Sequence, residues 1–389
     1  MHILLIPSSG YLQEESHLPG IFQQDQAHAL KRSGCQIGII SPRIRKLGML
    51  RQQLFGWEDG IVVLKDGEIP VYKLRKLVWV PRSYRADVRV WIQAGIALFK
   101  HYIDQQGKPD IIHAHDVLNA GLLATQLSEK FQIPYVITEH SSRFMIGKIP
   151  DFIIPDIKNS YKNANALLPV SPNLGSLLSA KFGSSFQNWE WVPNLLSQTF
   201  ETQELPIRSD RRKEFRFLNV ATLHPNKSHA LLLEAFATQF RGRSEIQLRI
   251  GGEGSQRHLL EEKIRTLGIE QQVFFLGDLD RRQVLTAMQA CDAFVLSSNY
   301  ETFGVVLIEA LACGKPVIAT ACGGPECMVN SGNGILVPTQ NEPALGAAMV
   351  KIMEQINQYN PLAIRQDCIA RFGEKAVVSR LLEIYARHV

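Results

Sequence analysis

Long hydrophobic runs are missing from this sequence of 389 residues. A helix that crosses a bilayer needs about 20 consecutive, mainly apolar residues. Polar residues interrupt the apolar stretches well before that length, which excludes a membrane-spanning helix. The opening residues, MHILLIPSSG, lack a basic start and a long apolar segment, so they predict a buried strand and not a signal peptide. We therefore expect a cytoplasmic protein.

Cysteine is also scarce and widely spaced. The six cysteines form no C-x-x-C pair, which argues against a zinc ribbon and against a framework of disulfide bonds. We expect most of them to fill small spaces in the core. They are Cys35, Cys291, Cys313, Cys322, Cys327 and Cys368.

An excess of one charge is absent as well. The formal net charge of +5 is too small to indicate a nucleic-acid partner. Basic residues are concentrated in residues 74–91, LRKLVWVPRSYRADVRVW, where they alternate with aromatic ones. Such a stretch can rest peripherally on an anionic membrane face or grip a phosphorylated acceptor. A solvated loop that leads into a helix explains it equally well.

Short apolar runs alternate with helical patterns along the whole chain, which is typical of an α/β fold with parallel sheets. The length favours two domains. Strands are predicted at Ile3–Pro7, Gln36–Ser41, Asp110–His113, Tyr135–Thr138, Ala166–Val170 and Glu190–Val192, then at Arg216–Ala221, Ile246–Gly251, Val273–Leu276, Ala293–Leu296, Pro316–Ala319 and Gly334–Val337. Residues 195–215 lose apolar periodicity and gain charge, as a linker does. The sequence predicts two Rossmann-like domains around a central cleft, residues 1–197 and 198–373.

Ligands of open parallel sheets bind beyond the carboxyl ends of the strands, so the loops there are the candidate sites. After one predicted strand, ATLHPNKSHALLLEAF places Lys227 at the start of a helix, where the lysine and the helix amides can hold a phosphate. An exposed lysine near a helix start is the simpler reading. After another strand, Gly252 and Gly254 in GGEG let a ligand approach the backbone closely.

The stretch ETFGVVLIEALACGKPVIAT places two glutamates eight positions apart at the start of a predicted helix. The amides of Thr302, Phe303, Gly304 and Val305 make an anion site at the helix amino terminus. Glu301 lies just outside it and can accept hydrogen bonds from hydroxyls. Glu309 lies within an apolar run, where an unpaired carboxylate is costly, so a diol or a cation should satisfy it. Together these loops indicate a nucleotide-sugar pocket.

The stretch HAHD ends another predicted strand. His113 and His115 alternate and so face the same side, which is compatible with a metal site. The H-x-H-x-D-H order of metallohydrolases is not present. A role for His115 or Asp116 on the acceptor side of a sugar pocket is the alternative.

At these residues the sequence resembles family 4 of the retaining glycosyltransferases, which have the type B fold. The E-x7-E spacing of Glu301 and Glu309 is the most specific element. GGEG, GDLDRRQVLTAMQACDAFVLSS, GGPE and NGILVP support it in the second half. PGIFQQDQAHALKRSGCQI, PDIIHAHDVLNAGLLA, IPYVITEHSSRF and VPN support it in the first half.

The resemblance implies roles for individual residues. Glu301 would hold hydroxyls of the donor sugar, Glu309 the ribose of the nucleotide, and Lys227 the departing diphosphate. His140, in TEHSS, matches the family's histidine near the donor sugar. Gly20, in PGIF, lies in the loop that approaches the diphosphate or acceptor.

The sequence departs from the family pattern at one position. Thr222 stands where many members have an arginine, five residues before the lysine, so the diphosphate loses a bidentate donor unless another cation replaces it. The resemblance further implies that a last helix, about residues 374–389, joins the first domain.

The resemblance implies retaining transfer from a UDP- or GDP-linked sugar to a glycan, a lipid-linked sugar or a small molecule, without a metal cofactor. A sugar-nucleotide epimerase or hydrolase of the same fold, and a non-catalytic sugar-nucleotide-binding subunit, are the alternatives.

Overall fold

The structure is a computed structural model that describes residues 1–389 except 8–10, 13–19, 47–59, 79–83, 187–188 and 206–213. The chain divides into two compact units. The first contains residues 1–170, 174–193 and 377–389, and the second contains residues 171–173 and 194–376. In the described part of the chain, helices that combine the length and the apolar character needed to cross a bilayer are not found.

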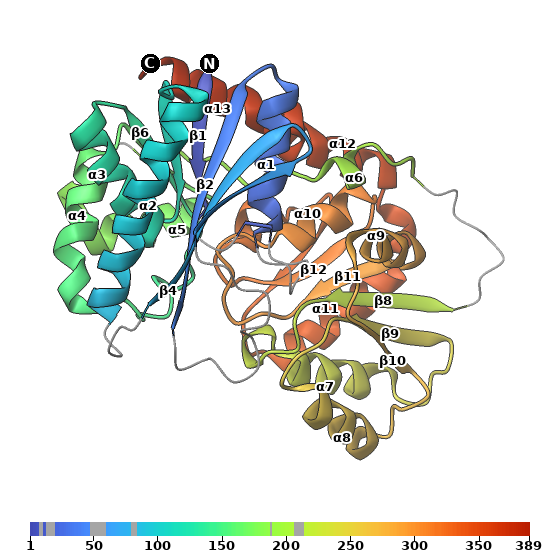
Figure 1. Cartoon of the computed structure of the whole chain (residues 1–389). Coiled ribbons are helices and arrows are strands. Elements are labelled where there is room, and N and C mark those ends of the chain that lie inside the picture. Colours follow the sequence, from blue (N-terminus) through green and yellow to red (C-terminus); the bar gives the residue numbers. More distant parts are fainter. Residues whose placement is uncertain (8–10, 13–19, 47–59, 79–83, 187–188, 206–213) are drawn as a thin grey trace. The chain divides into compact units, whose positions relative to one another are not determined.

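A seven-stranded sheet forms the centre of the first unit, with strand order β3-β4-β2-β1-β5-β6-β7 (Figure 1). Its strands are β1 (His2–Ile6), β2 (Gln36–Lys46), β3 (Gly60–Asp66), β4 (Ile69–Val78), β5 (Ile111–His115), β6 (Tyr135–Glu139) and β7 (Ala166–Pro169). Its helices are α1 (Ile21–Arg32), α2 (Tyr84–Gln106), α3 (Leu122–Phe131), α4 (Ile154–Asn163), α5 (Pro172–Phe182) and α13 (Glu374–Ala386). The sheet is parallel apart from β3, which pairs antiparallel with β4.

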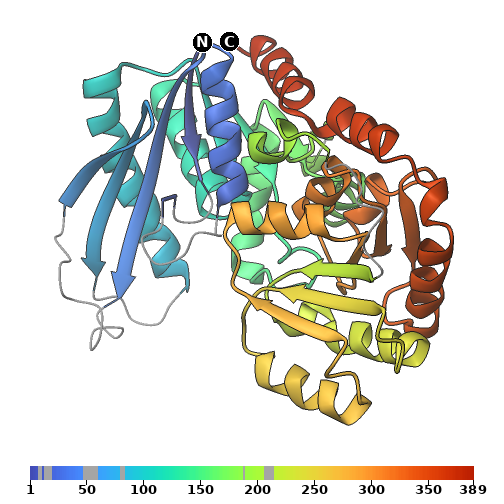
Figure 2. The ribbon, with the colours of Figure 1, turned by 90° about the vertical axis from the view of Figure 1, so that its right-hand side faces the viewer.

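The central strands of this sheet are completely buried. In β1, β5 and β6 every residue is buried, as expected for parallel strands covered by helices on both faces. The C-terminal helix α13 returns to this unit, where Tyr385 is fully buried and its hydroxyl lies 2.6 Å from His113 Nδ1. The two chain ends are close together in both ribbon views (Figure 2).

Two features of the first unit differ from the sequence-based expectation. The strand expected at residues 190–192 is wrong: the chain there runs beside β7 and bonds it through Glu190 N and Val192 N, but only Leu167 and Trp189 form a bridge. The hairpin β3–β4 was not anticipated, because β3 alternates half-buried and exposed residues and has no continuous apolar run. It takes up the start of the basic and aromatic stretch 74–91, of which residues 79–83 lie outside the described part.

A six-stranded parallel sheet forms the centre of the second unit, with order β10-β9-β8-β11-β12-β13. Its strands are β8 (Phe215–Val220), β9 (Ile246–Gly251), β10 (Val273–Gly277), β11 (Ala293–Leu296), β12 (Val317–Thr320) and β13 (Gly334–Val337). Its helices are α6 (Gln198–Glu201), α7 (His229–Phe240), α8 (Arg257–Leu267), α9 (Arg281–Ala290), α10 (Val305–Ala312), α11 (Glu342–Glu354) and α12 (Pro361–Phe372). All six predicted strands are present, within one residue at each end.

The order of the strands decides where ligands can approach. In the first unit the chain changes direction across the sheet between β1 and β5, and in the second between β8 and β11. Loops at such a switch point diverge and leave a crevice at the carboxyl edge of the sheet. The residues that the sequence singled out lie at or after the carboxyl ends of β1, β5 and β6 in one unit and of β8, β9 and β11 in the other.

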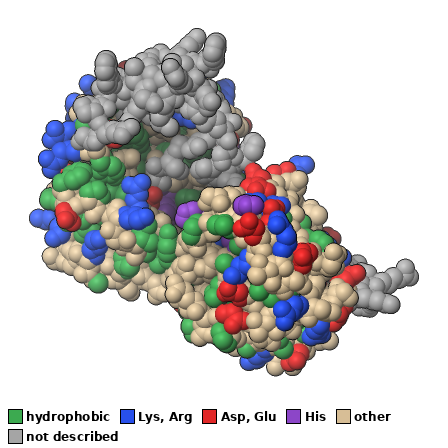
Figure 3. Space-filling view, turned by 90° about the horizontal axis from the view of Figure 1, so that it is seen from below, with side chains coloured by type: hydrophobic (Ala, Val, Ile, Leu, Met, Phe, Trp, Pro, Cys, Tyr) green, Lys and Arg blue, Asp and Glu red, His purple; other side chains and the backbone are tan. Residues whose placement is uncertain are grey.

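In Figure 3, basic and acidic side chains lie next to each other on the right-hand part of the surface, whereas basic side chains and apolar areas predominate on the left-hand part. This mixture agrees with the small net charge of +5. Over that face, the described residues do not form the continuous basic stripe that is typical of nucleic-acid binding.

Candidate active site

Lys227 and Glu301 meet at the carboxyl edge of the second sheet. Lys227 Nζ lies 2.6 Å from Glu301 Oε1, and Ser298 Oγ donates to the same oxygen at 2.7 Å. The side chains are partly exposed, 24% for Lys227 and 14% for Glu301. Lys227 follows β8 and Glu301 follows β11, so the switch point brings together two residues that are 74 positions apart.

Backbone and side-chain hydrogen bonds fix these two loops against each other. Asn226 Nδ2 donates to the carbonyl of Tyr300, and Asn299 N donates to the carbonyl of Asn226. Ser297 Oγ donates to the carbonyl of Lys227 at 2.8 Å. The Lys227–Glu301 contact is therefore held by the loops as well as by its own charges.

The start of α10 lies beside this pair. Gly304 precedes the helix with φ 102 and has no side chain to cap the first amides. The ring of Phe303 is buried against Phe372, with ring centres 5.8 Å apart, so only the backbone of Phe303 faces this end of the helix. Thr302 and Val305 are partly buried. These residues form a helix amino terminus of the kind that binds anions.

Glu309 is the fifth residue of α10 and is partly buried. Its neighbours Ile308 and Ala310 are completely buried. The sequence thus places a carboxylate on the one stripe of an apolar helix that is not fully covered, which is compatible with the ribose contact that we expected.

The glycine turn after β9 packs on the turn after β8. Gly252 has φ 128, and a Cβ at this position would overlap the carbonyl oxygen of Ala221. Leu223 N donates to the carbonyl of Glu253 at 2.9 Å. The protein's own backbone therefore requires glycine at position 252. A Cβ at Gly254 would likewise overlap the carbonyl oxygen of Leu223.

Thr222 lies within this paired turn and is exposed. Its backbone carbonyl accepts a hydrogen bond from His224 N at 2.7 Å. An arginine side chain at this position would find open space rather than a packed core. Packing in this structure therefore does not explain why threonine replaces the usual arginine.

Three histidines form a column of rings in the first unit. The ring centres of His113 and His115 lie 4.6 Å apart, and those of His115 and His140 lie 5.3 Å apart. His115 Nδ1 lies 3.0 Å from His140 Nε2. His113 contacts Thr138 Oγ1 at 2.7 Å and Tyr385 on α13.

Burial keeps these rings neutral. It lowers the pKa of His113 and of His140 well below the usual range, and lowers the pKa of His115 to about 3. A neutral ring has one donor and one acceptor nitrogen. The buried nitrogens His115 Nε2 and His140 Nδ1 have no hydrogen-bond partner among the described residues. Groups of three or more side chains arranged to hold a metal are not found in the described part of the chain.

Two carboxyl groups lie behind His140. Asp116 Oδ1 accepts the backbone N–H of His140 at 2.7 Å. Glu139 accepts from Val117 N and Ser141 N, both at 3.0 Å, and from the hydroxyl of Tyr161 at 2.9 Å. Burial first, and the charge of Asp116 second, raise the pKa of Glu139 well above its usual range.

Gly20 directly precedes α1 and has φ 84. Phe22, the second residue of α1, has its ring centre 4.6 Å from the ring centre of His140. The loop after β1 therefore reaches the histidine column, although residues 13–19 of that loop lie outside the described part. The sequence-based sites in the first unit, Gly20, His115, Asp116 and His140, are thus neighbours in space.

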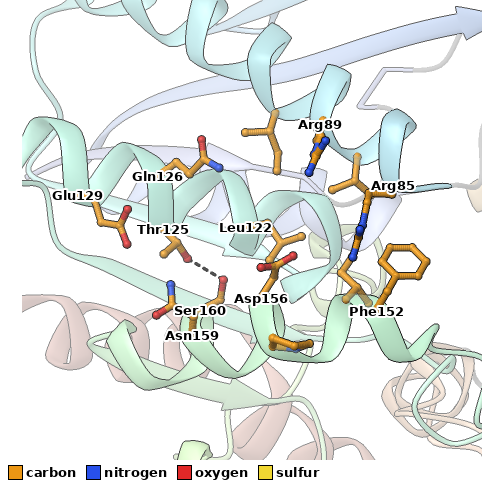
Figure 4. A pocket seen from close by; sticks show the side chains of 14 residues that line it. Arg85, Arg89, Leu122, Thr125, Gln126, Glu129, Phe152, Asp156, Asn159 and Ser160 are labelled. Carbon is orange, nitrogen blue, oxygen red and sulfur yellow. Dashed lines mark hydrogen bonds between the residues drawn. The ribbon is translucent and has the colours of Figure 1, made fainter. Parts of the chain in front are cut away.

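A separate groove of about 520 Å³ lies between α2, α3 and α4, and none of these candidate residues lines it (Figure 4). Arg85 and Arg89 point toward it from α2, and the guanidinium of Arg85 lies 5.1 Å from the ring centre of Phe152. Glu129 and Asp156 line it as well. The apolar part of its lining consists of Val88, Ile92, Leu122, Phe152, Ile153 and Pro155.

Two family models match the chain. The model described as Glycosyl transferases group 1 matches residues 201–365, and the model described as Glycosyltransferase Family 4 matches residues 22–197. Together they cover most of the chain. It belongs to glycosyltransferase family 4.

Relatives and solved structures agree with this membership. The chain is 26% identical to a glycogen synthase of Mycobacterium tuberculosis over 76% of its own length and 72% of the relative. It is 26% identical to the putative teichuronic acid biosynthesis glycosyltransferase TuaC of Bacillus subtilis, over 85% and 84%. The chain is a glycosyltransferase, as the E-x7-E spacing predicted.

The fold is the type B glycosyltransferase fold. The sucrose-phosphate synthase of Thermosynechococcus elongatus has a TM-score of 0.77 at 21% identity, covering 99% of this chain and 98% of that one. HepE of Anabaena in complex with UDP has a TM-score of 0.74 at 18% identity, covering 100% of both chains. The predicted fold class is confirmed.

The sequence reasoning missed the residues that hold the candidate residues in place. Ser298, the second donor to Glu301, was overlooked because serine at a strand end is common. Glu139 was overlooked although it is a carboxylate at the end of the apolar strand YVITE, which is a signal that sequence reading could have used. Tyr161 gave no signal, because its partner is 22 residues away.

Proposed function

We propose that this glycosyltransferase is a retaining enzyme that uses a nucleoside-diphosphate sugar, UDP- or GDP-linked. The proposed acceptor is a glycan, a lipid-linked sugar or a small molecule. The contact of Lys227 with Glu301 beside the uncapped start of α10 carries the proposal, because it joins a cation, a hydroxyl acceptor and an anion site in one place. The UDP complex of HepE, which shares the fold, supports a nucleotide-sugar donor.

The proposed chemistry follows from where charge develops. As the glycosidic bond breaks, the sugar becomes oxocarbenium-like and the diphosphate gains negative charge, so fixed positive groups at the diphosphate stabilise the transition state. Lys227 and the first amides of α10 supply them. Lys227 then exchanges its bond with Glu301 for one with the diphosphate, and Glu301 turns to the sugar hydroxyls. Glu309 holds the ribose, and His140 binds the donor sugar.

The leaving diphosphate takes the acceptor proton in this proposal, so neither a protein nucleophile nor a metal is needed. Transfer should therefore continue in excess EDTA. A loss of transfer that Mg²⁺ or Mn²⁺ restores would contradict the metal-free mechanism.

A thermal-shift panel of UDP-, GDP- and ADP-linked sugars tests the donor. One class should raise the melting temperature, and nucleoside diphosphate should then be released only when an acceptor is added. Release without acceptor would indicate a hydrolase, and a changed sugar configuration without release would indicate an epimerase. Binding without either would indicate a non-catalytic subunit. The anomeric configuration of the product, read by NMR, tests retention.

We further propose that the enzyme works in the cytoplasm and contacts an anionic membrane face through the edge of the groove. Arg85 and Arg89 are exposed, lie one helical turn apart, and have no ion-pair partner among the described residues. Phe152 beside them is 38% exposed. Two cations next to an exposed aromatic ring suit the interface of an anionic bilayer.

Vesicle flotation tests this contact. The protein should float with phosphatidylglycerol vesicles and not with phosphatidylcholine vesicles, and Arg85→Glu/Arg89→Glu should abolish flotation. Lys100→Glu/Lys108→Glu is the matched control, since it changes the net charge equally at two exposed positions of the same unit. Equal loss in both variants would show that net charge, not this edge, is responsible.

A further inference from the structure

Asp116 and Glu139 bind each other's neighbouring backbone. Asp116 follows β5 and accepts the N–H of His140, the residue after Glu139, at 2.7 Å. Glu139 ends β6 and accepts the N–H of Val117, the residue after Asp116, at 3.0 Å. Each acid thus holds the chain directly after the other acid. This reciprocal arrangement ties together the loops that follow two adjacent strands.

The buried carboxyl groups of Asp116 and Glu139 must keep one proton between them. The reciprocal backbone contacts bring the two carboxyl groups close to each other, and Glu139 is 1% exposed. Two ionised carboxylates repel each other strongly in a buried site. Among the residues that the structure describes, the titratable groups that face Glu139 are Asp116, from the loop after β5, and Tyr161, from α4. Neither is a cation, so a shared proton is the available way to offset the repulsion.

The backbone of Asp116 shows that this arrangement is imposed. Asp116 has φ 66 and ψ 143, a conformation that residues with a side chain rarely adopt. Asp116 N donates to the carbonyl of Thr138 at 2.7 Å, which joins the two loops once more. Such strain persists only where the surroundings fix it, and it is often found at functional sites.

The clamp fixes one histidine in particular. Asp116 holds the backbone of His140, and His115 holds its ring at Nε2. The ring nitrogen Nδ1 is left without a partner among the described residues. With the backbone and one nitrogen fixed, the direction of the other nitrogen is also fixed.

We propose that Asp116 and Glu139 are positioning residues that share one proton and clamp the loops after β5 and β6, so that His140 presents Nδ1 to the donor. The proposal rests on the proposed role of His140 in donor binding. It assigns Asp116 to the support of His140 rather than to the acceptor.

The first test needs no substrate and therefore stands apart from the proposed function. Glu139→Gln keeps a hydrogen-bond donor but cannot ionise. Since the folded protein holds the proton of Glu139 and the unfolded chain releases it above pH 4.5, the wild type should lose stability relative to the variant as pH rises. The difference in melting temperature between the two proteins should shift by roughly 3–5 °C per pH unit between pH 5 and 7. A difference that does not depend on pH would overturn the shared proton.

The second test measures positioning, with the donor that the thermal-shift panel identifies. Tyr161→Phe removes one hydrogen bond to Glu139 and should lower kcat about 10-fold while KM changes little. Tyr135→Phe is the matched control, since its buried hydroxyl donates to the carbonyl of Ser160 and does not touch the pair. Glu139→Ala should lower kcat about 100-fold, and Glu139→Gln, which keeps one of the two accepting oxygens, should lower it clearly less.

The outcomes separate the two proposals. Equal kcat in Tyr161→Phe and Tyr135→Phe, or no difference between Glu139→Ala and Glu139→Gln, would overturn the positioning role. Full transfer by His140→Ala would instead refute the proposed role of His140, whereas the pH dependence of the melting temperature would stand unchanged.

Discussion

Replacing Glu301 by glutamine separates a catalytic role of its charge from a structural one. The variant keeps the shape of the side chain and an oxygen that can still accept from Ser298 Oγ, which lies 2.7 Å from Oε1. It removes the charge that faces Lys227 Nζ at 2.6 Å. A structural role of the charge would change the stability of the fold, whereas a catalytic role would change the rate of sugar transfer.

The stability effect should be small. Both side chains are partly exposed, and an ion pair of that kind contributes about 1 kcal/mol or less. The effect on transfer should be larger, because the sugar hydroxyls lose a charged acceptor in a site where donors and acceptors act on the transition state. We expect a loss of at least about 100-fold in kcat/KM, which corresponds to roughly 2.7 kcal/mol.

Steady-state release of nucleoside diphosphate, together with thermal unfolding, measures both quantities. Glu234→Gln is the matched control, since Glu234 Oε1 lies 2.5 Å from Lys263 Nζ in the same unit, away from the strand ends. The control should show a similar small change in melting temperature and unchanged transfer. Transfer by Glu301→Gln within about 3-fold of the wild type would refute the assignment of this glutamate, whatever its effect on stability.

Three further predictions follow from named contacts. Thr222→Arg should tighten the binding of UDP or GDP by about 5- to 10-fold, since an exposed arginine adds a bidentate donor next to Lys227. Unchanged or weaker binding in a calorimetric titration would contradict this prediction. Gly252→Ala should lower the free energy of unfolding by more than about 2 kcal/mol, because the added Cβ would overlap the carbonyl oxygen of Ala221. Gly242 also has a positive φ but faces open space, so Gly242→Ala should lower it by only about 1 kcal/mol. Equal losses in the two variants, measured by denaturant unfolding, would contradict this prediction. Stability should fall as the pH drops below 6.5, since His113, His115 and His140 have lowered pKa values in the folded protein and bind protons only when it unfolds. Each ring contributes a loss of up to about 1.4 kcal/mol per pH unit, and Glu139, whose pKa is raised, opposes this loss. A melting temperature that increases as the pH is lowered from 6.5 to 5 would contradict the prediction.

The strands of the second unit illustrate what local pattern can predict. All six were found from short, mainly apolar runs bounded by turn residues. The signal is strongest in β11 and β12, which are buried at every residue, as parallel strands covered on both faces are. The hairpin β3–β4 could not be found in this way, since β3 exposes every second residue at the sheet edge. The prediction of a strand at residues 190–192 was wrong because this segment makes too few hydrogen bonds to β7 to form a ladder.

The sequence by itself determined the α/β class, the family and the position of Lys227, Glu301 and His140 at strand ends, because apolar periodicity and motif spacing are local properties. Only the tertiary structure decided which of these residues meet. The pairing of Lys227 with Glu301 depends on β8 lying next to β11, and the clamp of Asp116 and Glu139 depends on β5 lying next to β6. Strand order is set by packing across the whole sheet, so residues far apart in the chain become neighbours that no local pattern reveals.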